Sequence, residues 1–189
     1  EPGRAGKATG EDRTVEFYWV GSEARLAGTL VHRYLQRLAE APLSLEECPV
    51  PDLIVGRWIV ESGLDDDAGA RILARVNDAV AAMLEDEKGR WILSGKGYTE
   101  LPLQGLVEGE LVSVILDRVR IDDDGNHWII DYKTSTHEGG DLGTFLAAER
   151  TRYEPQMARY KTLYQAWSGK DAKVALYFPL LRTFLEIER

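Results

Sequence analysis

Cysteine is almost absent from this chain of 189 residues, and its scarcity excludes several classes of protein. The single cysteine, Cys48, cannot form an internal disulfide or hold an iron–sulfur cluster, and it fits a reducing compartment. No apolar run approaches the roughly 18 residues of a membrane span, and no apolar signal-peptide core follows the polar residues 1–14. The sequence therefore predicts a cytoplasmic protein without a membrane attachment.

Positive charge is also scarce. The chain has 23 lysines and arginines against 32 aspartates and glutamates, a formal net charge of -9. Such a protein cannot coat nucleic acid through its bulk charge, so a nucleic acid must be held at a local site. One stretch has the opposite balance, because residues 150–161 contain four basic residues against Glu154. This stretch is either a phosphate-facing patch or the ordinary flank of a helix.

The length and the ordinary share of apolar residues predict one compact domain. Residues 1–14 have almost nothing to bury, so we expect them to form a flexible linker from an upstream region. The chain also lacks an initiator methionine, which suggests a piece of a longer protein. Residues 15–189 are expected to form the domain.

The hydrophobic pattern divides this domain into a helical N-terminal half and a second half rich in strands. Residues 15–20 are expected as a short strand or docking segment. Helices are expected over residues 22–39, 51–60, 67–85 and 154–167. Strands are expected over residues 98–103, 110–121, 127–134, 173–179 and 183–188.

The two long central strands are predicted to form a hairpin around the loop 122–126, whose Asp, Gly and Asn residues suit a five-residue turn. In a regular hairpin of this length, Val119 faces Ile129 and Asp117 faces Asp131. The two carboxylates then lie side by side, where like charges repel and desolvation is costly. The residues expected on the same face are Ile115, Val119, Ile121 and Ile129.

The opposite face of this hairpin is apolar as well. Its expected residues are Val112, Val114, Leu116, Trp128, Ile130 and Tyr132. A sheet that is apolar on both faces must be covered on both, which predicts a three-layer α/β core with a mixed central sheet flanked by helices.

The two acidic residues need a compensating positive charge. Lys133 follows Asp131 by two residues and shares its face, and a divalent cation between the carboxylates would remove their repulsion. Hard oxygen ligands beside an ammonium group suit Mg²⁺-assisted attack of water on a phosphodiester. The alternative interpretation is a salt-bridged cluster, or a loop of another length that turns one acid outward.

Asp117, followed by Asp131-Tyr132-Lys133, resembles the Asp plus (Asp/Glu)-x-Lys signature of the PD-(D/E)XK nuclease superfamily. Three flanking segments are similar to motifs of its RecB/AddA-like branch. They are Gly28 to Leu35 (Gly-x-x-x-His-x-x-Leu), residues 99–102 (Glu-x-Pro) and residues 156–160 (Gln-x-x-x-Tyr). Four patterns in the family order are far more specific than any one of them. The resemblance covers residues 15–189.

This resemblance implies a restriction-endonuclease-like fold and a Mg²⁺-dependent DNA nuclease, with Mn²⁺ able to replace Mg²⁺. The metal ligands it suggests are His32, Asp117, Asp131 and the carbonyl of Tyr132. The catalytic residues it suggests are Lys133, Asp117, Asp131 and Glu100, the last acting either as a direct ligand or in support of the ligands. Contacts with DNA are expected from Gln156, Tyr160, Arg152 and Arg159.

Members of this branch are typically the C-terminal nuclease of a superfamily 1 helicase, which implies an exonuclease that prefers single-stranded DNA and works with a helicase in DNA repair or recombination. The helicase would belong to the same polypeptide or to a partner subunit. No nucleotide site is expected in this chain, because the glycine-rich residues 89–97 depart from the P-loop spacing and lack its Ser or Thr. We expect a turn there. The alternative function is a non-catalytic, nuclease-like module that binds DNA or stabilises a larger repair complex.

Overall fold

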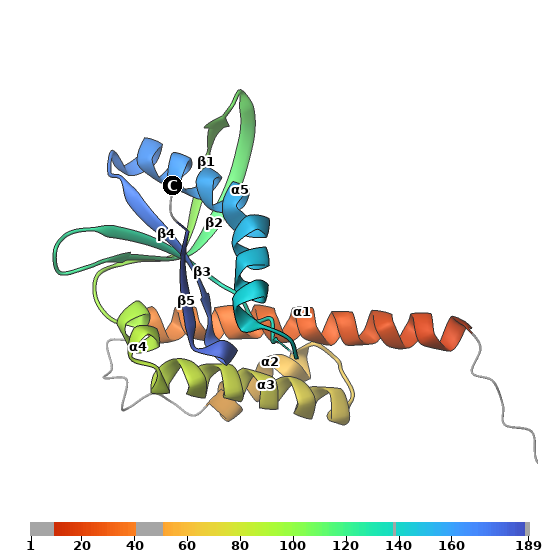
Figure 1. Ribbon diagram of the computed structural model, residues 1–189. Coiled ribbons are helices and arrows are strands. Elements are labelled where there is room, and N and C mark those ends of the chain that lie inside the picture. Colours follow the sequence, from red (N-terminus) through yellow and green to blue (C-terminus); the bar gives the residue numbers. More distant parts are fainter. Residues whose placement is uncertain (1–9, 41–50, 138, 188–189) are drawn as a thin grey trace, which may run out of the picture.

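A computed structural model describes residues 10–40, 51–137 and 139–187, and shows helices on both faces of one sheet (Figure 1). The helices are α1 (Gly10–Glu40), α2 (Pro51–Glu61), α3 (Asp66–Glu85), α4 (Glu87–Leu93) and α5 (Leu142–Ser168). The strands are β1 (Gly97–Val107), β2 (Glu110–Ile121), β3 (His127–Tyr132), β4 (Ala172–Phe178) and β5 (Thr183–Ile187). A short 3-10 helix, η2 (Pro179–Leu181), links β4 to β5.

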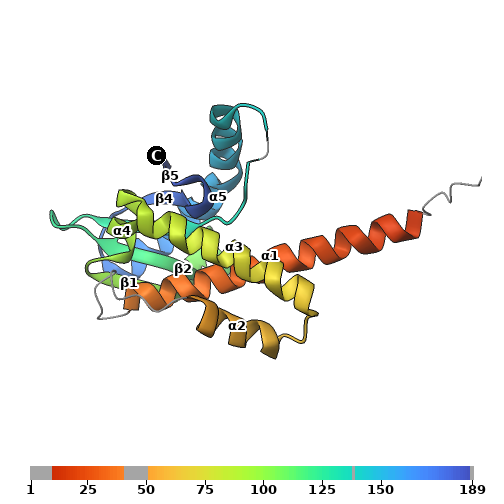
Figure 2. The ribbon, with the colours of Figure 1, turned by 90° about the horizontal axis from the view of Figure 1, so that it is seen from below.

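The five strands form one mixed sheet in the order β1-β2-β3-β4-β5. Strands β3 and β4 are parallel and are connected through α5, while the other neighbouring strands are antiparallel. Two separate clusters of buried apolar residues lie on the two faces of this sheet. The first cluster joins the sheet to α1, α2, α3 and α4, and the second joins it to α5. Figure 2 shows α1 and α3 side by side in the first helical layer. The predicted three-layer α/β fold is therefore confirmed.

The hairpin that carries the acidic residues has the predicted register. Val119 pairs with Ile129, and the regular pairing of β2 with β3 ends at Arg118 and Ile130. The loop is held by Asp122, whose carboxylate accepts hydrogen bonds from the backbone N–H groups of residues 124 and 126. Burial opposes ionisation of Asp122, but hydrogen bonds from the Asn126 side-chain amide and the Trp128 indole N–H, together with these backbone bonds, outweigh it and lower its pKa to about 2. The loop therefore fixes the register that brings Asp117 beside the end of β3.

The two faces of β2 differ from the prediction. Leu116 packs in the α5-side cluster together with Val119 and Ile129, whereas Trp128 and Ile130 lie in the other cluster. Val112 and Val114 also pack against the α5-side cluster, and Ile115 is exposed. The reason lies at the point opposite Asp117, where main-chain pairing of β1 with β2 skips Glu100 and this residue has a φ of 45°. At this point the regular alternation of side chains between the two faces of the sheet is interrupted in both strands. Leu116 and Val119, three residues apart, therefore lie on the same face.

The N-terminal helix is longer than predicted. Helix α1 begins at Gly10 and not at Ser22, so residues 15–20 are helical and their interpretation as a strand or docking segment is wrong. A helix that has already formed gains a hydrogen bond for each added residue, which overrides a weak local preference for strand. The helix also includes residues 10–14 of the expected linker, and residues 1–9 lie outside the described part of the chain. None of the described helices is both long and apolar enough to cross a membrane.

Helix α5 begins twelve residues before its predicted start. Asp141 caps it by accepting a hydrogen bond from the Thr144 N–H, and the helix continues through Pro155 to Ser168. Pro155 therefore lies inside the helix and not in its first turn, which is the position that proline favours. The short helix α4 was not predicted, and it occupies much of the glycine-rich stretch expected as a turn. Strand β1 extends to Val107, while β3 ends at Tyr132, so Lys133 lies just beyond the strand.

Candidate metal centre and active site

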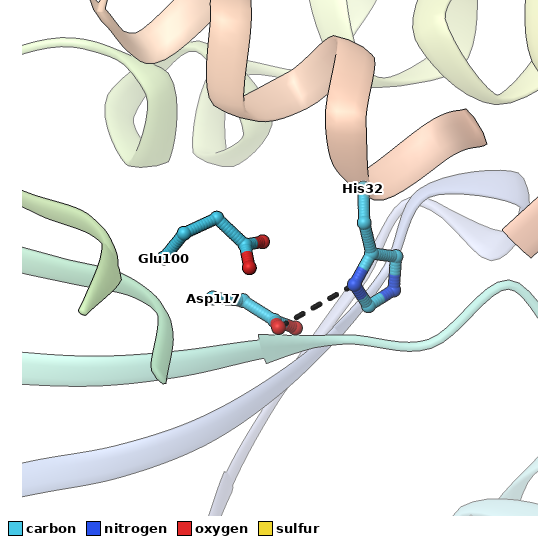
Figure 3. Close-up of side chains that lie close together, drawn as sticks. All are labelled: His32, Glu100 and Asp117. Carbon is cyan, nitrogen blue, oxygen red and sulfur yellow. Dashed lines mark ion pairs between the residues drawn. The ribbon is translucent and has the colours of Figure 1, made fainter. Parts of the chain in front are cut away.

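Three potential metal ligands from three different elements meet at one end of the central hairpin (Figure 3). His32 comes from α1, Glu100 from β1 and Asp117 from β2, and one ligand atom of each lies within 4.8 Å of the others. His32 Nδ1 lies 3.4 Å from Asp117 Oδ1. The structure thus brings together two acidic residues and one histidine that lie far apart in the sequence.

Local backbone geometry aims Asp117 and His32 at each other. Because regular pairing of β2 with β3 stops one residue earlier, the backbone N–H of Tyr132 donates to Asp117 Oδ2 instead, at 2.8 Å. One turn before His32, a Cβ atom on Gly28 would lie 3.1 Å from the Thr134 hydroxyl oxygen. Glycine therefore lets α1 approach the end of β3 closely, which gives a physical reason for the Gly-x-x-x-His spacing.

Asp131 and Lys133 form a buried ion pair next to this group. Asp131 is only 4% exposed, and its Oδ2 lies 2.6 Å from Lys133 Nζ. The ammonium group also lies over the ring of Tyr153, 3.8 Å from its centroid. On the other side, Gln156 Nε2 donates to Asp131 Oδ1 at 3.1 Å and to the Tyr160 hydroxyl at 2.7 Å. Both oxygens of Asp131 are therefore held in place.

The carboxyl groups of Asp131 and Glu100 are charged only at an energetic cost. Burial, together with the nearby charge of Asp117, raises the pKa of Asp131 to about 6. Burial and the same charge also raise the pKa of Glu100. For His32, burial lowers the pKa, but its hydrogen bond to Asp117 and the charge of that carboxylate outweigh this and raise it. Each of these raised pKa values means that the group binds its proton more tightly in the folded protein than it would in water. This is expected where negative charge is in excess.

The residues present fit a divalent metal ion. Two ligands on opposite sides of such an ion lie about 4–5 Å apart, and the ligand atoms of His32, Glu100 and Asp117 satisfy this spacing. One imidazole nitrogen with carboxylate oxygens is a mixed donor set that suits Mg²⁺ or Mn²⁺. Asp131 lies beside the group and feels the charge of Asp117. A bound cation would remove the repulsion that raises the carboxyl pKa values.

Comparison with known families gives an independent result. Residues 18–186 match the family described as the PD-(D/E)XK nuclease superfamily. The chain belongs to this superfamily. Its members are generally metal-dependent nucleases, and the mixed sheet flanked by helices is consistent with their restriction-endonuclease-like fold. A search of curated proteins returns no match.

In this PD-(D/E)XK chain, a cleft of about 910 Å³ opens beside the acidic residues. His32 and Glu100 line it, as does Arg152, one of the four residues expected to contact DNA. Gln156 and Tyr160 lie next to Asp131 through the hydrogen bonds described above. Arg159 is exposed and is not among the residues that line this cleft.

Sequence patterns alone did not identify three other arginines in the cleft wall. Arg25 and Arg33 come from α1, and Arg75 comes from α3. Arg25 precedes His32 by seven residues, and this two-turn spacing would have placed it on the same side of a helix as the histidine. Nothing in the sequence links Arg75 to the site, because only the packing of α3 against α1 brings it there.

Proposed function

We propose that this PD-(D/E)XK chain is a Mg²⁺-dependent DNA nuclease that hydrolyses phosphodiester bonds. The observation that carries the proposal is the arrangement of His32, Glu100 and Asp117 beside the buried Asp131–Lys133 pair. A purely structural salt bridge does not need a histidine and two further acidic groups at its side. Such an excess of negative charge at a partly buried site is typical of a site that binds a cation.

The protein would hold the metal through His32, Asp117 and Asp131, with the Tyr132 carbonyl and Glu100 completing the set. When bound, Mg²⁺ or Mn²⁺ would lower the pKa of a water molecule and neutralise charge on the phosphate. The Tyr132 N–H fixes the orientation of Asp117, and the Gln156 amide fixes that of Asp131. The protein thereby holds its ligands ready before substrate arrives.

Lys133 is the residue that we propose to act on the attacking water. Its ammonium group is held between Asp131 and the Tyr153 ring, and its side chain is only 16% exposed. From this position the ammonium can orient the water and offset the charge that develops on the phosphate, whereas Nζ would accept the proton of the water only as the neutral amine. We therefore expect its loss to slow turnover by about 10²- to 10⁴-fold while metal affinity changes little.

The finer features of the proposal rest on the RecB/AddA-like motifs. The segments from Gly28 to Leu35 and from Gln156 to Tyr160 support an exonuclease that prefers single-stranded DNA. In this proposal the chain serves as the nuclease of a cytoplasmic helicase–nuclease in DNA repair or recombination, and residues 1–14 connect it to an upstream helicase region. Mn²⁺ would replace Mg²⁺, and neither an iron–sulfur cluster nor a nucleotide site would be needed.

A cleavage time course on end-labelled DNA tests the proposal. Single-stranded and duplex oligonucleotides are incubated with the chain in Mg²⁺, in Mn²⁺ and in EDTA. We expect metal-dependent cleavage that is faster on the single strand, with short labelled products if cutting begins at an end. Lys133→Ala should cleave about 10²- to 10⁴-fold more slowly than wild type, while Lys173→Ala should be fully active because this exposed lysine lies over Trp128, away from the cleft.

Absence of cleavage by the wild-type chain in both metals would contradict the proposal. If the same preparation still bound DNA, the alternative of a non-catalytic DNA-binding module would be favoured. Equal loss of activity in Lys133→Ala and Lys173→Ala would show that the assigned lysine has no special role.

A further inference from the structure

The cleft beside the metal ligands has a charge opposite to that of the whole chain. Four arginines line it, namely Arg25, Arg33, Arg75 and Arg152. Glu100, already part of the metal-ligand group, is the acidic residue in its lining. The whole chain has a formal net charge of -9. A positive cleft in an acidic protein raises the local concentration of anions.

Three of these arginines keep most of their hydrogen-bonding capacity. Within the described part of the chain, ion pairs occupy Arg57, Arg71, Arg152 and Arg182, but no carboxylate pairs with Arg25, Arg33 or Arg75. A guanidinium group has five N–H donors, so the few contacts they make leave several donors for a ligand.

Each of the three is nevertheless anchored. Arg75 Nη2 donates to the Thr134 carbonyl at 2.9 Å, and its buried Nε has no partner among the described residues. Arg33 lies over the ring of Trp58 at 4.3 Å, and Arg25 Nε donates to the Gly21 carbonyl at 3.3 Å. Anchored side chains lose less conformational entropy when they bind an anion. The contacts therefore favour a built anion-binding wall over a set of free surface arginines.

Arg33 adjoins His32 on α1, whereas Arg25 lies farther along the same helix from the metal ligands. Arg25 and His32 are seven residues apart, which corresponds to about 10 Å along a helix axis. Stacked nucleotides of one strand are spaced about 3.4 Å apart, so this distance corresponds to about three nucleotides. With the cleaved phosphate at the metal ligands, as the proposed function has it, this part of the cleft is placed for phosphates that neighbour the cleaved bond.

We propose that Arg25, Arg33, Arg75 and Arg152 bind the backbone phosphates of the substrate strand on one side of the cleaved bond. This inference rests on the proposed nuclease function and names the part of the chain that grips the DNA. Guanidinium contacts to phosphates carry no base information, so the binding is independent of sequence. With at most four arginines involved, affinity is modest and the salt dependence shallow.

Fluorescence anisotropy in EDTA measures this binding without cleavage. The probe is a labelled oligothymidylate of about 16 nucleotides, titrated with the full chain at several salt concentrations. We compare Arg25→Gln and Arg75→Gln with Arg37→Gln, an exposed arginine of α1 that is not among the residues lining the cleft. Each cleft variant should weaken binding about 3- to 10-fold and lower the salt slope by about 0.7. Arg37→Gln should bind within about twofold of wild type.

Unchanged binding by both cleft variants, or an equal loss in Arg37→Gln, would overturn the inference. Arg25→Gln decides the matter if Arg75→Gln is unstable, because Arg25 is exposed and its replacement does not disturb the core. Failure here is distinct from failure of the nuclease proposal. A wild-type chain that cleaves DNA but is indifferent to these variants contradicts only the arginine cleft, whereas arginine-dependent binding without cleavage contradicts only the catalytic proposal.

Discussion

Replacing Asp131 by asparagine should stabilise the metal-free protein while abolishing its cleavage of DNA. Asp131 is 4% exposed, and burial next to Asp117 raises its pKa from the usual 3.8 to about 6. A change of about two pH units corresponds to ~3 kcal/mol at neutral pH. This is the free energy by which the folded protein disfavours the charged form of the side chain, with the attraction of Lys133 already included.

Asparagine resembles the protonated form of the aspartate. It keeps an oxygen that can accept the hydrogen bond from Gln156, and it carries no charge to desolvate. It loses the 2.6 Å ion pair, but Lys133 keeps its contact with the Tyr153 ring. We therefore expect the free energy of unfolding of Asp131→Asn in EDTA to exceed that of wild type by about 1–3 kcal/mol at about pH 7.5.

The pH dependence of this difference follows from the sign of the pKa change. Because the folded-state pKa of Asp131 is raised, the folded protein binds its proton more tightly than the unfolded chain does. This contribution stabilises wild type most at low pH, decreases as the pH rises from about 4 to about 6, and is constant above that range. The advantage of Asp131→Asn should therefore grow over this interval and then level off.

Urea unfolding followed by tryptophan fluorescence measures this difference, since the chain has five tryptophans. Asp171→Asn is the control, because the ion pair of Asp171 with Lys161 is largely exposed and should contribute less than about 1 kcal/mol. Adding Mg²⁺ should stabilise wild type more than Asp131→Asn, since only the former keeps its full ligand set. A variant less stable than wild type in EDTA near neutral pH would refute the reasoning.

Three further substitutions test other parts of the site. His32→Ala should weaken Mg²⁺ binding at least about 10-fold in calorimetry, with activity partly restored by excess Mn²⁺; full Mg²⁺ affinity would remove His32 from the ligand set. Gly28→Val should lower metal affinity with little change in secondary structure, because the added side chain would press on Thr134 and move α1 away from Asp117. Unchanged metal affinity would show that the close approach of α1 to Thr134 is not needed for metal binding. Arg118→Met should destabilise the fold by about 2–4 kcal/mol, since Arg118 is 2% exposed and donates to the carbonyls of Ile92, Ser94, Gly95 and Tyr98; unfolding at the wild-type urea concentration would contradict this.

The central hairpin could be predicted from the sequence because it is formed by local interactions. A five-residue loop joins its strands, and the loop residues and the alternating apolar residues determine the register. Pairing of Val119 with Ile129 was confirmed for this reason. The nearness of Asp117 to the end of β3 follows from the same register.

Only the tertiary structure determined which side chains from other elements meet at this hairpin. The packing of α1 brings His32 to Asp117, and the interrupted pairing at Glu100 resets the faces of β1 and β2. Packing of α3 against α1 places Arg75 in the cleft with Arg25. These contacts join residues far apart in the chain, and their formation depends on which surfaces pack together. A hairpin is specified by neighbouring residues, whereas a site assembled from α1, α3, α5 and three strands is specified only by the packing of the whole domain.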